Sequence, residues 1–462
     1  MQTFRKRYLG DRAFYRMTLA VAVPIMIQNG ITSFVSLLDN LMVGRLGTEP
    51  MSSVAIVNEL LFVYNLCIFG GLGGAGIFTA QFYGQGDQEG VRSTFRYKLL
   101  LALGLTALAV GIFLGMGDRL ISLFLTGDSE GGDLALTLSC GLEYLRVVLF
   151  GLPAFMLVQT YTSTLRECSE TVMPMKAGIA AVLVNLMLNW VLIYGRLGFP
   201  ALGVTGAALA TVISRWVEFT VIAVWTHRHT ARNPWAAGLY RTLHVPGRLV
   251  RRLIVKGSPL LVNEALWSGA EAMLGQCYSV LGLTVVAAMN ISLTIGNLFS
   301  IVFLSMGSAV AIIVGQRLGA GRMEEAREVN ARLIAFSVMC AAGTGLLMFL
   351  IAPLFPRLYN TTDAARMTAV QLIRVTALFM PLHAFLNACY FTLRSGGKTI
   401  ITFIFDSVFS WVVSVPIAFV LSRYSDWSAP AILTAVNAAQ LLKCVFGYRL
   451  VKKGVWLHNI VN

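Results

Sequence analysis

Residues 81–92 read QFYGQGDQEGVR, and residues 316–327 read QRLGAGRMEEAR. A glutamine, two glycines, a glutamate and an arginine recur between the two stretches at a constant offset of 235 residues. Matches elsewhere, at offsets of 235 and 228 respectively, link Pro24 with Pro259 and Pro153 with Pro381. Three regions in register along half the chain predict an internal repeat. We expect the glycines and the glutamine of each stretch to form a tight turn between two helices.

The composition of the 462-residue chain places it in a membrane. Hydrophobic residues make up 56% and charged residues only 13%, whereas a soluble globular chain has ~25% charged residues. The mean hydropathy is +0.72. These values exclude an ordinary soluble enzyme, a disordered chain and a collagen-like chain. The net charge of +14 is explained by basic cytoplasmic loops, so no nucleic-acid partner is predicted.

Apolar runs between charged residues, glycines and prolines predict twelve transmembrane helices, because about 20 apolar residues cross the hydrocarbon. No cleavable signal peptide is expected at the start of the chain. The predicted fold class is therefore an all-α integral membrane protein. The twelve expected spans are 17–43, 52–80, 99–117, 134–163, 174–195, 202–226, 254–281, 284–313, 331–352, 368–393, 399–422 and 429–450.

The distribution of lysine and arginine over the predicted loops indicates the orientation. One side of the membrane holds 27 of these bases, including those of the 227–253 loop. The other side holds six: Arg45, Arg119, Arg196, Arg357, Arg366 and Arg423. The positive-inside rule predicts that both termini and this loop are cytoplasmic, in the plasma (inner) membrane.

Each half of the repeat contains six spans, so both halves enter and leave the membrane on the same face. This is the parallel kind of repeat, related by an axis along the membrane normal. We predict an N-terminal lobe of residues 1–226, a cytoplasmic linker of 227–253 and a C-terminal lobe of 254–462. The substrate site is expected in a central cavity between two lobes that alternate in access.

Several motifs that would indicate an enzyme or a cofactor are absent or misplaced. The GxGxxG pattern at 71–76 lies late in an apolar span, where small residues favour close helix packing rather than dinucleotide binding. The chain has no P-loop lysine motif and no HExxH, and its seven cysteines are scattered. No catalytic residue, no cofactor and no metal site are predicted, apart from a sodium ion that Asp39 could bind.

Several sequence stretches carry a family resemblance. The runs PIMIQN at 24–29 and DNLMVGRLG at 39–47 resemble the first helix of the multidrug and toxic compound extrusion (MATE) family, within the wider multidrug/oligosaccharidyl-lipid/polysaccharide exporter superfamily. The repeated turns, NLMLN at 185–189 and LRSGGK at 393–398 are also similar to that family. The resemblance implies an exporter of amphipathic organic cations that is driven by inward flow of protons or sodium.

Asp39 is the leading candidate for ion coupling. It is an acid near the outer end of the first span, and intramembrane charge is costly enough to be a functional hypothesis by default. The resemblance places an essential acid at this point. Asn185 and Asn189 in span five complete the predicted coupling site with Glu264 of span seven. One subgroup has an aspartate where this chain has Asn189, and an asparagine can offer oxygen to sodium but carries no proton.

Glu264 and Glu271 are predicted to bind the substrate. Seven residues apart, they lie on one face of a helix about 10 Å from each other, with Trp267 between them. Two acids and an aromatic ring suit an organic cation through charge pairing and cation–π attraction. The sequence leaves open which of the two acids is essential. One MATE subgroup has its glutamate one turn beyond Glu264.

Two further residues complete the predicted substrate site. His383 stands where one subgroup has an aspartate in span ten, and a histidine titrates near neutral pH. Asp406 in span eleven either lines a cytoplasm-facing cavity or pairs with a base from a loop.

The predicted function is cation-coupled multidrug antiport by a monomer in the lipid bilayer. The alternative within the same superfamily is a lipid-linked saccharide flippase, which needs cationic residues in its cavity. It is disfavoured because Arg146 and Arg215 each have an acid three residues away, which leaves chiefly Arg374. A membrane-embedded enzyme is a possibility of another class that no catalytic motif supports.

Overall fold

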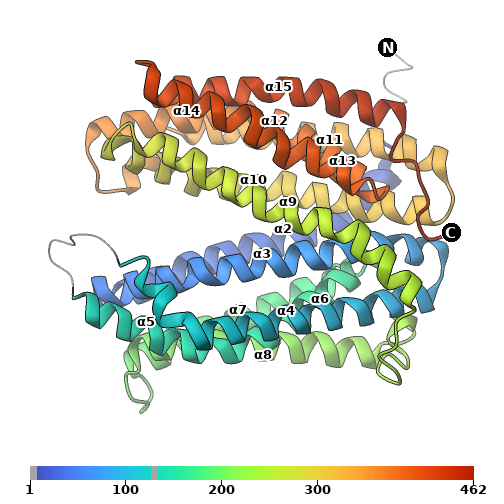
Figure 1. The fold of residues 1–462 in the computed structure, drawn as a ribbon, viewed down its shortest axis with the longest axis horizontal. Coiled ribbons are helices and arrows are strands. Elements are labelled where there is room, and N and C mark those ends of the chain that lie inside the picture. The colour runs from blue at the N-terminus through green and yellow to red at the C-terminus, as the bar shows by residue number, and fades with distance from the viewer. Residues whose placement is uncertain (1–7, 126–132) are drawn as a thin grey trace. The chain divides into compact units, whose positions relative to one another are not determined.

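The computed structural model describes residues 8–125 and 133–462, and every regular element in this part of the chain is helical (Figure 1). The predicted twelve-helix fold is confirmed.

The first half contains α2 (Arg12–Gly44), α3 (Thr48–Gln85), α4 (Gln88–Ser122), α5 (Leu134–Val148) continued by η1 (Leu149–Gly151) and α6 (Leu152–Glu167), α7 (Val172–Tyr194) and α8 (Gly203–Arg228). The second half contains α9 (Gly247–Ser279), α10 (Leu283–Gly319), α11 (Met323–Ile351), α12 (Asp363–Ser395), the continuous run of α13 (Thr399–Phe403), η4 (Ile404–Val408), η5 (Ser410–Ser414) and α14 (Val415–Tyr424), and α15 (Ala429–Lys453). Two short 3-10 turns are η2 (Pro234–Ala236) and η3 (Phe355–Leu358).

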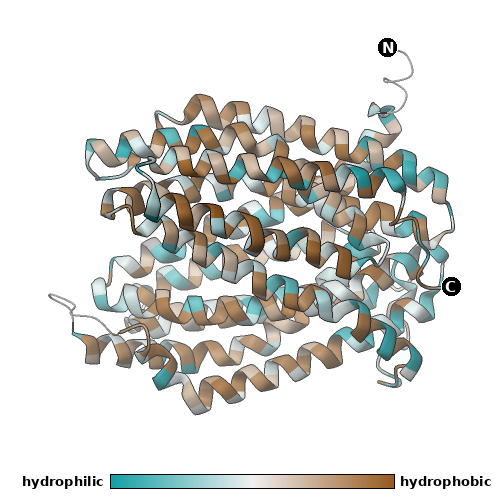
Figure 2. Cartoon of the chain, turned by 45° about the horizontal axis from the view of Figure 1, so that its top comes forward, coloured by the Kyte–Doolittle hydropathy of each residue, from teal (hydrophilic) through white to brown (hydrophobic). Residues whose placement is uncertain are grey.

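Eleven of these helical segments in the described chain are long and apolar enough to cross a membrane. The twelfth, α9, begins with Arg251, Arg252 and Lys256 and carries Glu264 and Glu271 further along, so it is less apolar than the others. Figure 2 shows brown hydrophobic surfaces along most helices and teal residues gathered at helix ends and loops. The chain is a multi-pass membrane protein, with α9 as its most polar long helix.

The chain forms two compact units. Unit 1 comprises Met1–Met26, Ala80–Asp87 and Ile254–Asn462, and unit 2 comprises Ile27–Thr79 and Gln88–Leu253. Each unit has its own apolar core, which includes Val57, Ile68 and Ile121 in unit 2. The cores of unit 1 include Ile313, Leu333, Leu372 and Ile373. The first half of α2 and the end of α3 belong to unit 1, although they precede residue 227 in the sequence.

The 227–253 segment packs on unit 2. Trp235 is buried against the Phe95 ring, with the ring centroids 5.4 Å apart. Arg92 of α4 donates from Nε to the Trp235 carbonyl oxygen at 3.1 Å, and Arg96 donates to the Leu239 carbonyl oxygen at 3.0 Å. This segment is thus an ordered part of unit 2.

The two repeated turns have the same geometry. Gly86 and Gly321 both have positive φ, +83° and +74°, a conformation that glycine adopts without a Cβ penalty. The Asp87 and Arg322 amides donate to equivalent carbonyls five residues earlier, at 2.9 and 3.0 Å. The glutamate and arginine of each repeat form an ion pair, Glu89 with Arg92 and Glu324 with Arg327. The glycines therefore make the predicted tight turn.

The first glycine of each turn serves a different purpose within unit 1. A Cβ on Gly84 would lie 1.9 Å from the Gln316 carbonyl oxygen, and one on Gly319 would lie 1.9 Å from the Gln81 carbonyl oxygen. The Gln81 side chain is fully buried and donates to the Ser395 and His458 carbonyl oxygens at 2.9 and 3.2 Å. The glutamine thus anchors backbone of unit 1 rather than forming the turn.

Because of this close backbone contact, we expect alanine to destabilise the protein at Gly319 far more than at a glycine with free space around it. Gly319→Ala is expected to destabilise the fold by about 1–3 kcal/mol, because the new methyl group meets fixed backbone. Gly343→Ala is the matched control, since Gly343 lies in a helix of the same unit with no atom near a built Cβ. Thermal unfolding of the purified protein in detergent measures both. Equal midpoints for the two variants would contradict the close-approach explanation.

Candidate ion-coupling and cation-binding sites

Asp39 lies in unit 2 beside the two asparagines predicted to accompany it. The Asn189 side chain donates from Nδ2 to Asp39 Oδ1 at 2.6 Å. With its amide turned so that the nitrogen faces the carboxylate, Asn185 lies 2.9 Å from the same oxygen. Both asparagines are buried and Asp39 is half-buried. The structure therefore brings three of the four predicted coupling residues together, on α2 and α7.

The asparagine pair reaches Asp39 because α7 is held against the second half of α2. The Tyr194 hydroxyl donates to the Met42 carbonyl oxygen at 3.0 Å, and Gly178 gives close approach to the Gln28 side chain. In the described chain, Asn189 Oδ1 accepts no hydrogen bond although it is buried. Both amides therefore present donor nitrogens to the Asp39 carboxylate, and such donors compensate for part of its negative charge.

Arg215 of α8 is a basic partner of this site that the sequence did not indicate. It interacts electrostatically with Asp39 and forms an ion pair with Glu218 at 2.8 Å. The i,i+3 pairing of Arg215 with Glu218 was expected, whereas its approach to Asp39 depends on how α8 packs on α2. Arg215 therefore compensates for part of the negative charge of Asp39.

In unit 1, Asp406 forms an ion pair with Lys443. The Lys443 ammonium lies 2.7 Å from Asp406 Oδ1, and the Asn263 amide donates to Asp406 Oδ2 at 3.3 Å. Ser407 in turn donates to Asn263 Oδ1 at 2.7 Å. Of the two alternatives for Asp406, pairing with a base is therefore present in the structure. The base comes from α15 rather than from a loop.

Asp406 lies in a π-helical stretch formed by η4 and η5. Pro416 is the second residue after this stretch, and a proline lacks the N–H that would continue a regular helix. Wider π turns occur often at functional sites. They place Asp406 and the two phenylalanines Phe405 and Phe409 around Lys443, whose Nζ lies 5.0 and 5.9 Å from the two ring centroids.

Glu264 and Glu271 of α9 belong to the same unit-1 cluster. Both interact electrostatically with Asp406. Glu264 is half-buried and also interacts with Arg394, while Glu271 has an exposed side chain. In the described part of the chain, neither glutamate forms a hydrogen bond or an ion pair through its side chain.

Trp267 and His383 are the remaining predicted substrate residues, and both lie in unit 1. Trp267 lies on α9 with 37% of its surface exposed. The imidazole of His383 is half-buried and bonds through Nε2 to Asn437 Oδ1 at 2.9 Å. All five predicted substrate residues lie in unit 1, whereas Asp39 lies in unit 2, so the predicted coupling pair of Asp39 and Glu264 is divided between the units.

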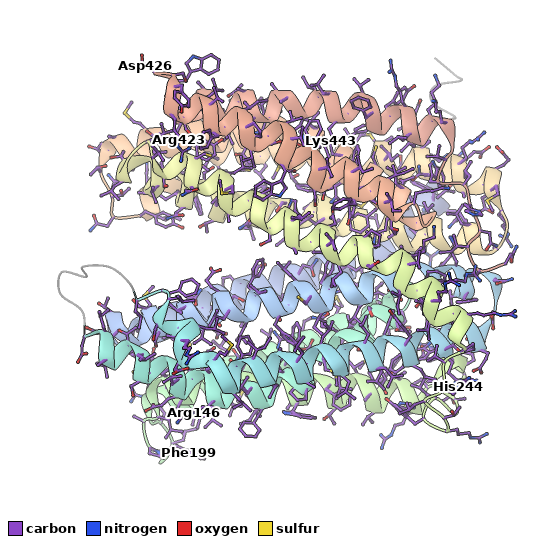
Figure 3. All side chains as sticks on the ribbon, viewed as in Figure 1. Arg146, Phe199, His244, Arg423, Asp426 and Lys443 are labelled. Carbon is purple, nitrogen blue, oxygen red and sulfur yellow. The ribbon has the colours of Figure 1, made fainter. Side chains whose placement is uncertain are left out.

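Two of the 27 bases that the sequence assigns to the cytoplasmic side, Lys98 and Lys443, are instead buried within helices. Lys443 lies along the middle part of α15 (Figure 3). Lys98 of α4 is fully buried and forms an ion pair with Glu167 at 2.5 Å. Gly76, from the discounted GxGxxG pattern, makes room for this glutamate, since a Cβ there would lie 2.1 Å from Glu167 Oε1. A lysine near the edge of an apolar run was the only sequence signal for either pair.

Across residues 8–125 and 133–462, no group of three or more His, Cys, Asp or Glu side chains is placed to hold a metal ion. The arrangement consists of two polar clusters in separate units: carboxylate with amides in unit 2, and carboxylates with bases in unit 1. In the described chain, neither cluster contains a paired nucleophile and base.

Known proteins resemble this chain over almost its whole length. A multidrug resistance protein, PmpM, of Pseudomonas aeruginosa is 27% identical over 91% of this chain and 86% of its own length. The multidrug resistance protein NorM of Vibrio vulnificus is 27% identical over 88% of each chain. The crystal structure of a MATE in complex with MaL6 matches the fold with a TM-score of 0.85 at 22% identity, over 98% of both chains.

A family model described as MatE matches residues 24–191 and 259–420, which together form most of the chain. The two matched segments each cover one copy of the internal repeat. MATE proteins are transporters rather than enzymes, which agrees with the absence of a catalytic motif. The chain therefore belongs to the MATE family of membrane transporters.

Proposed function

We propose that this protein is a cation-coupled multidrug antiporter that exports amphipathic organic cations by alternating access. The observation that carries the proposal is the Asp39 site, a carboxylate within a membrane-spanning helix that contacts two buried amides. Membership of the MATE family and its multidrug resistance relatives support the same function.

In the proposed cycle, a proton or a sodium ion binds Asp39 from outside and neutralises the carboxylate. Loss of this negative charge weakens the hold on a cationic substrate, which then leaves outward. Each unit charge that moves inward across 100 mV contributes ~2.3 kcal/mol. Because an exported organic cation carries positive charge outward against the same potential, the potential drives export only when more positive charge enters with the coupling ions than leaves with the substrate.

Glu264, Glu271, Trp267, His383 and Asp406 form the proposed substrate site of unit 1. The glutamates supply negative charge that no base satisfies by an ion pair in the described chain, and Trp267 supplies an exposed aromatic face. An organic cation gains from both, through Coulomb attraction and cation–π contact. Glu264 serves both the substrate and the coupling ion in this proposal.

The proposed setting is a monomer in the plasma (inner) membrane, with both termini and the 227–253 segment cytoplasmic. The basic loops support this orientation. The two sequence lobes, 1–226 and 254–462, would alternate in access, and the 227–253 segment would move with unit 2.

The flippase alternative has less support. A flippase requires free cationic side chains for a pyrophosphate group, whereas Lys98, Arg215 and Lys443 are each bound to a carboxylate. The expected Arg146 pair with Glu143 is absent from the described ion pairs, and Arg374 lies over the Phe349 ring at 5.3 Å. Because Lys98, Arg215 and Lys443 are paired with carboxylates, the structure favours organic cations over a pyrophosphate-linked lipid as the substrate.

Removing the Asp39 charge is expected to abolish coupling. In proteoliposomes loaded with ethidium, Asp39→Asn should lower efflux more than tenfold under an imposed proton gradient or sodium gradient, whichever drives the wild type. Glu324→Gln, at a glutamate whose side chain is 80% exposed, should transport at the wild-type rate. A wild-type rate for Asp39→Asn under both gradients would show that Asp39 is not the coupling acid.

Substrate affinity should depend on the charges of α9. Glu264→Gln and Glu271→Gln are each expected to weaken equilibrium binding of ethidium about 5- to 30-fold, the effect of about 1–2 kcal/mol of lost Coulomb attraction. Fluorescence titration of the purified protein measures both dissociation constants, with the exposed acid Asp363→Asn as the control. The larger of the two losses identifies the essential acid, and unchanged affinity in both variants would exclude this face of α9.

A further inference from the structure

The Lys443 ammonium occupies the position beside Asp406 where a mobile cation would otherwise bind. Its side chain is 7% exposed, and it lies within hydrogen-bonding distance of a carboxylate inside a helical bundle. In such a pair the attraction between the two charges offsets part of the hydration that each group loses on burial. Lys443 is therefore a cation that the chain itself holds in place among the acids of unit 1.

The oxygen atoms that a sodium ion would need around Asp406 already accept hydrogen bonds. Asp406 Oδ1 accepts from Lys443 and Oδ2 accepts from Asn263. Asn263 Oδ1 accepts from Ser407. Sodium binds to several oxygen ligands at once, as hard cations do. It would have to displace the tethered ammonium, which has no diffusional freedom to lose.

The groups around Asp406 contain more acids than bases. The charged groups that interact with Asp406 are Glu264 and Glu271 of α9 and Lys443 of α15, and Arg394 of α12 interacts with Glu264. His383 and Tyr390 of α12 are the other titratable neighbours. With three carboxylates against two bases, and His383 left out of the count, the formal charge of these five groups is one unit negative. A single proton or a single organic cation neutralises it.

The glutamates are the groups that remain available for that charge. In the described chain neither Glu264 nor Glu271 is in an ion pair, whereas Asp406 is. A proton that binds either glutamate turns a carboxylate into a neutral acid without disturbing the Lys443 contact. A substrate cation that binds the same glutamates competes with that proton.

We propose that Lys443 is a built-in substitute for a sodium ion in unit 1, and that it makes this unit respond to protons rather than to sodium. Lys443 is thus the residue that determines ion specificity in unit 1. The inference rests on the proposed cation-coupled antiport and assigns the ion used by the unit-1 cluster. Unit 2 differs, because Asp39 has amides in place of an ammonium in direct contact.

The decisive variant is Lys443→Gln, which removes the fixed charge and leaves Asp406 free. In full-length protein carrying Asp39→Asn, sodium chloride should raise the thermal unfolding midpoint relative to choline chloride only when Lys443→Gln is also present. In proteoliposomes with Asp39 intact, Lys443→Gln should increase ethidium efflux under a sodium gradient several-fold over the wild type. Lys452→Gln, further along the same helix and packed on Tyr448, should do neither.

The double variant Asp406→Asn/Lys443→Gln tests whether the gained sodium response belongs to Asp406. We expect it to fold without an unpaired buried charge and to show no sodium response. The inference is overturned if Lys443→Gln folds and stays insensitive to sodium, or if the double variant gains the same response.

A second measurement keeps the inference testable if Lys443→Gln does not fold. The Asp39→Asn protein with Lys443 intact should show the same unfolding midpoint in sodium chloride and in choline chloride. A sodium-specific increase that disappears on adding Asp406→Asn would overturn the inference. Failure of the proposed antiport looks different, since the wild type would then move no ethidium under either gradient while these binding measurements could still be made.

Discussion

A charged side chain within a membrane-spanning bundle must find its compensation inside the protein, because the hydrocarbon offers none. This constraint organises the polar residues of both units. Lys98 pairs with Glu167, Arg215 with Glu218 and Lys443 with Asp406. Breaking such a pair by removing one partner leaves an uncompensated charge, at a cost of about 3–5 kcal/mol. Of the acids in the proposed sites, Asp39, Glu264 and Glu271 are in no ion pair of the described chain, and we propose that these three bind a mobile cation.

The parts of the fold that depend on local chemistry were predictable from the sequence. The spans follow from runs of apolar residues, and the two repeated turns follow from glycines that adopt positive φ at equivalent positions. The Glu89–Arg92 pair recurs as Glu324–Arg327 because i,i+3 neighbours share a helix face. These features need only the residues within one or two helical turns, so one sequence suffices.

The contacts between distant helices were beyond the reach of the sequence. Asp39 and Asn189 are 150 residues apart, and Lys98 and Glu167 are 69 residues apart. Periodicity shows which side of a helix is polar, but it does not show which other helix that side faces. For the same reason Lys98 and Lys443 were counted with the loop bases. The packing of the 227–253 segment on α4 also depends on backbone carbonyls as acceptors, which are the same for every sequence.

The repeat places equivalent residues in different surroundings in the two units. The offset of 228 pairs Arg166 with Arg394, and the offset of 235 pairs Gln28 with Asn263. In unit 2, Arg166 donates from one terminal nitrogen to the Gln28 amide oxygen at 2.5 Å, and Asp39 contacts its asparagines instead. In unit 1, Asn263 donates to Asp406 instead, and Arg394 acts on Glu264. Equivalent positions thus serve structure in one unit and surround the acids in the other. A duplicated six-helix element can therefore keep its turns and core while each copy acquires its own compensation of charge.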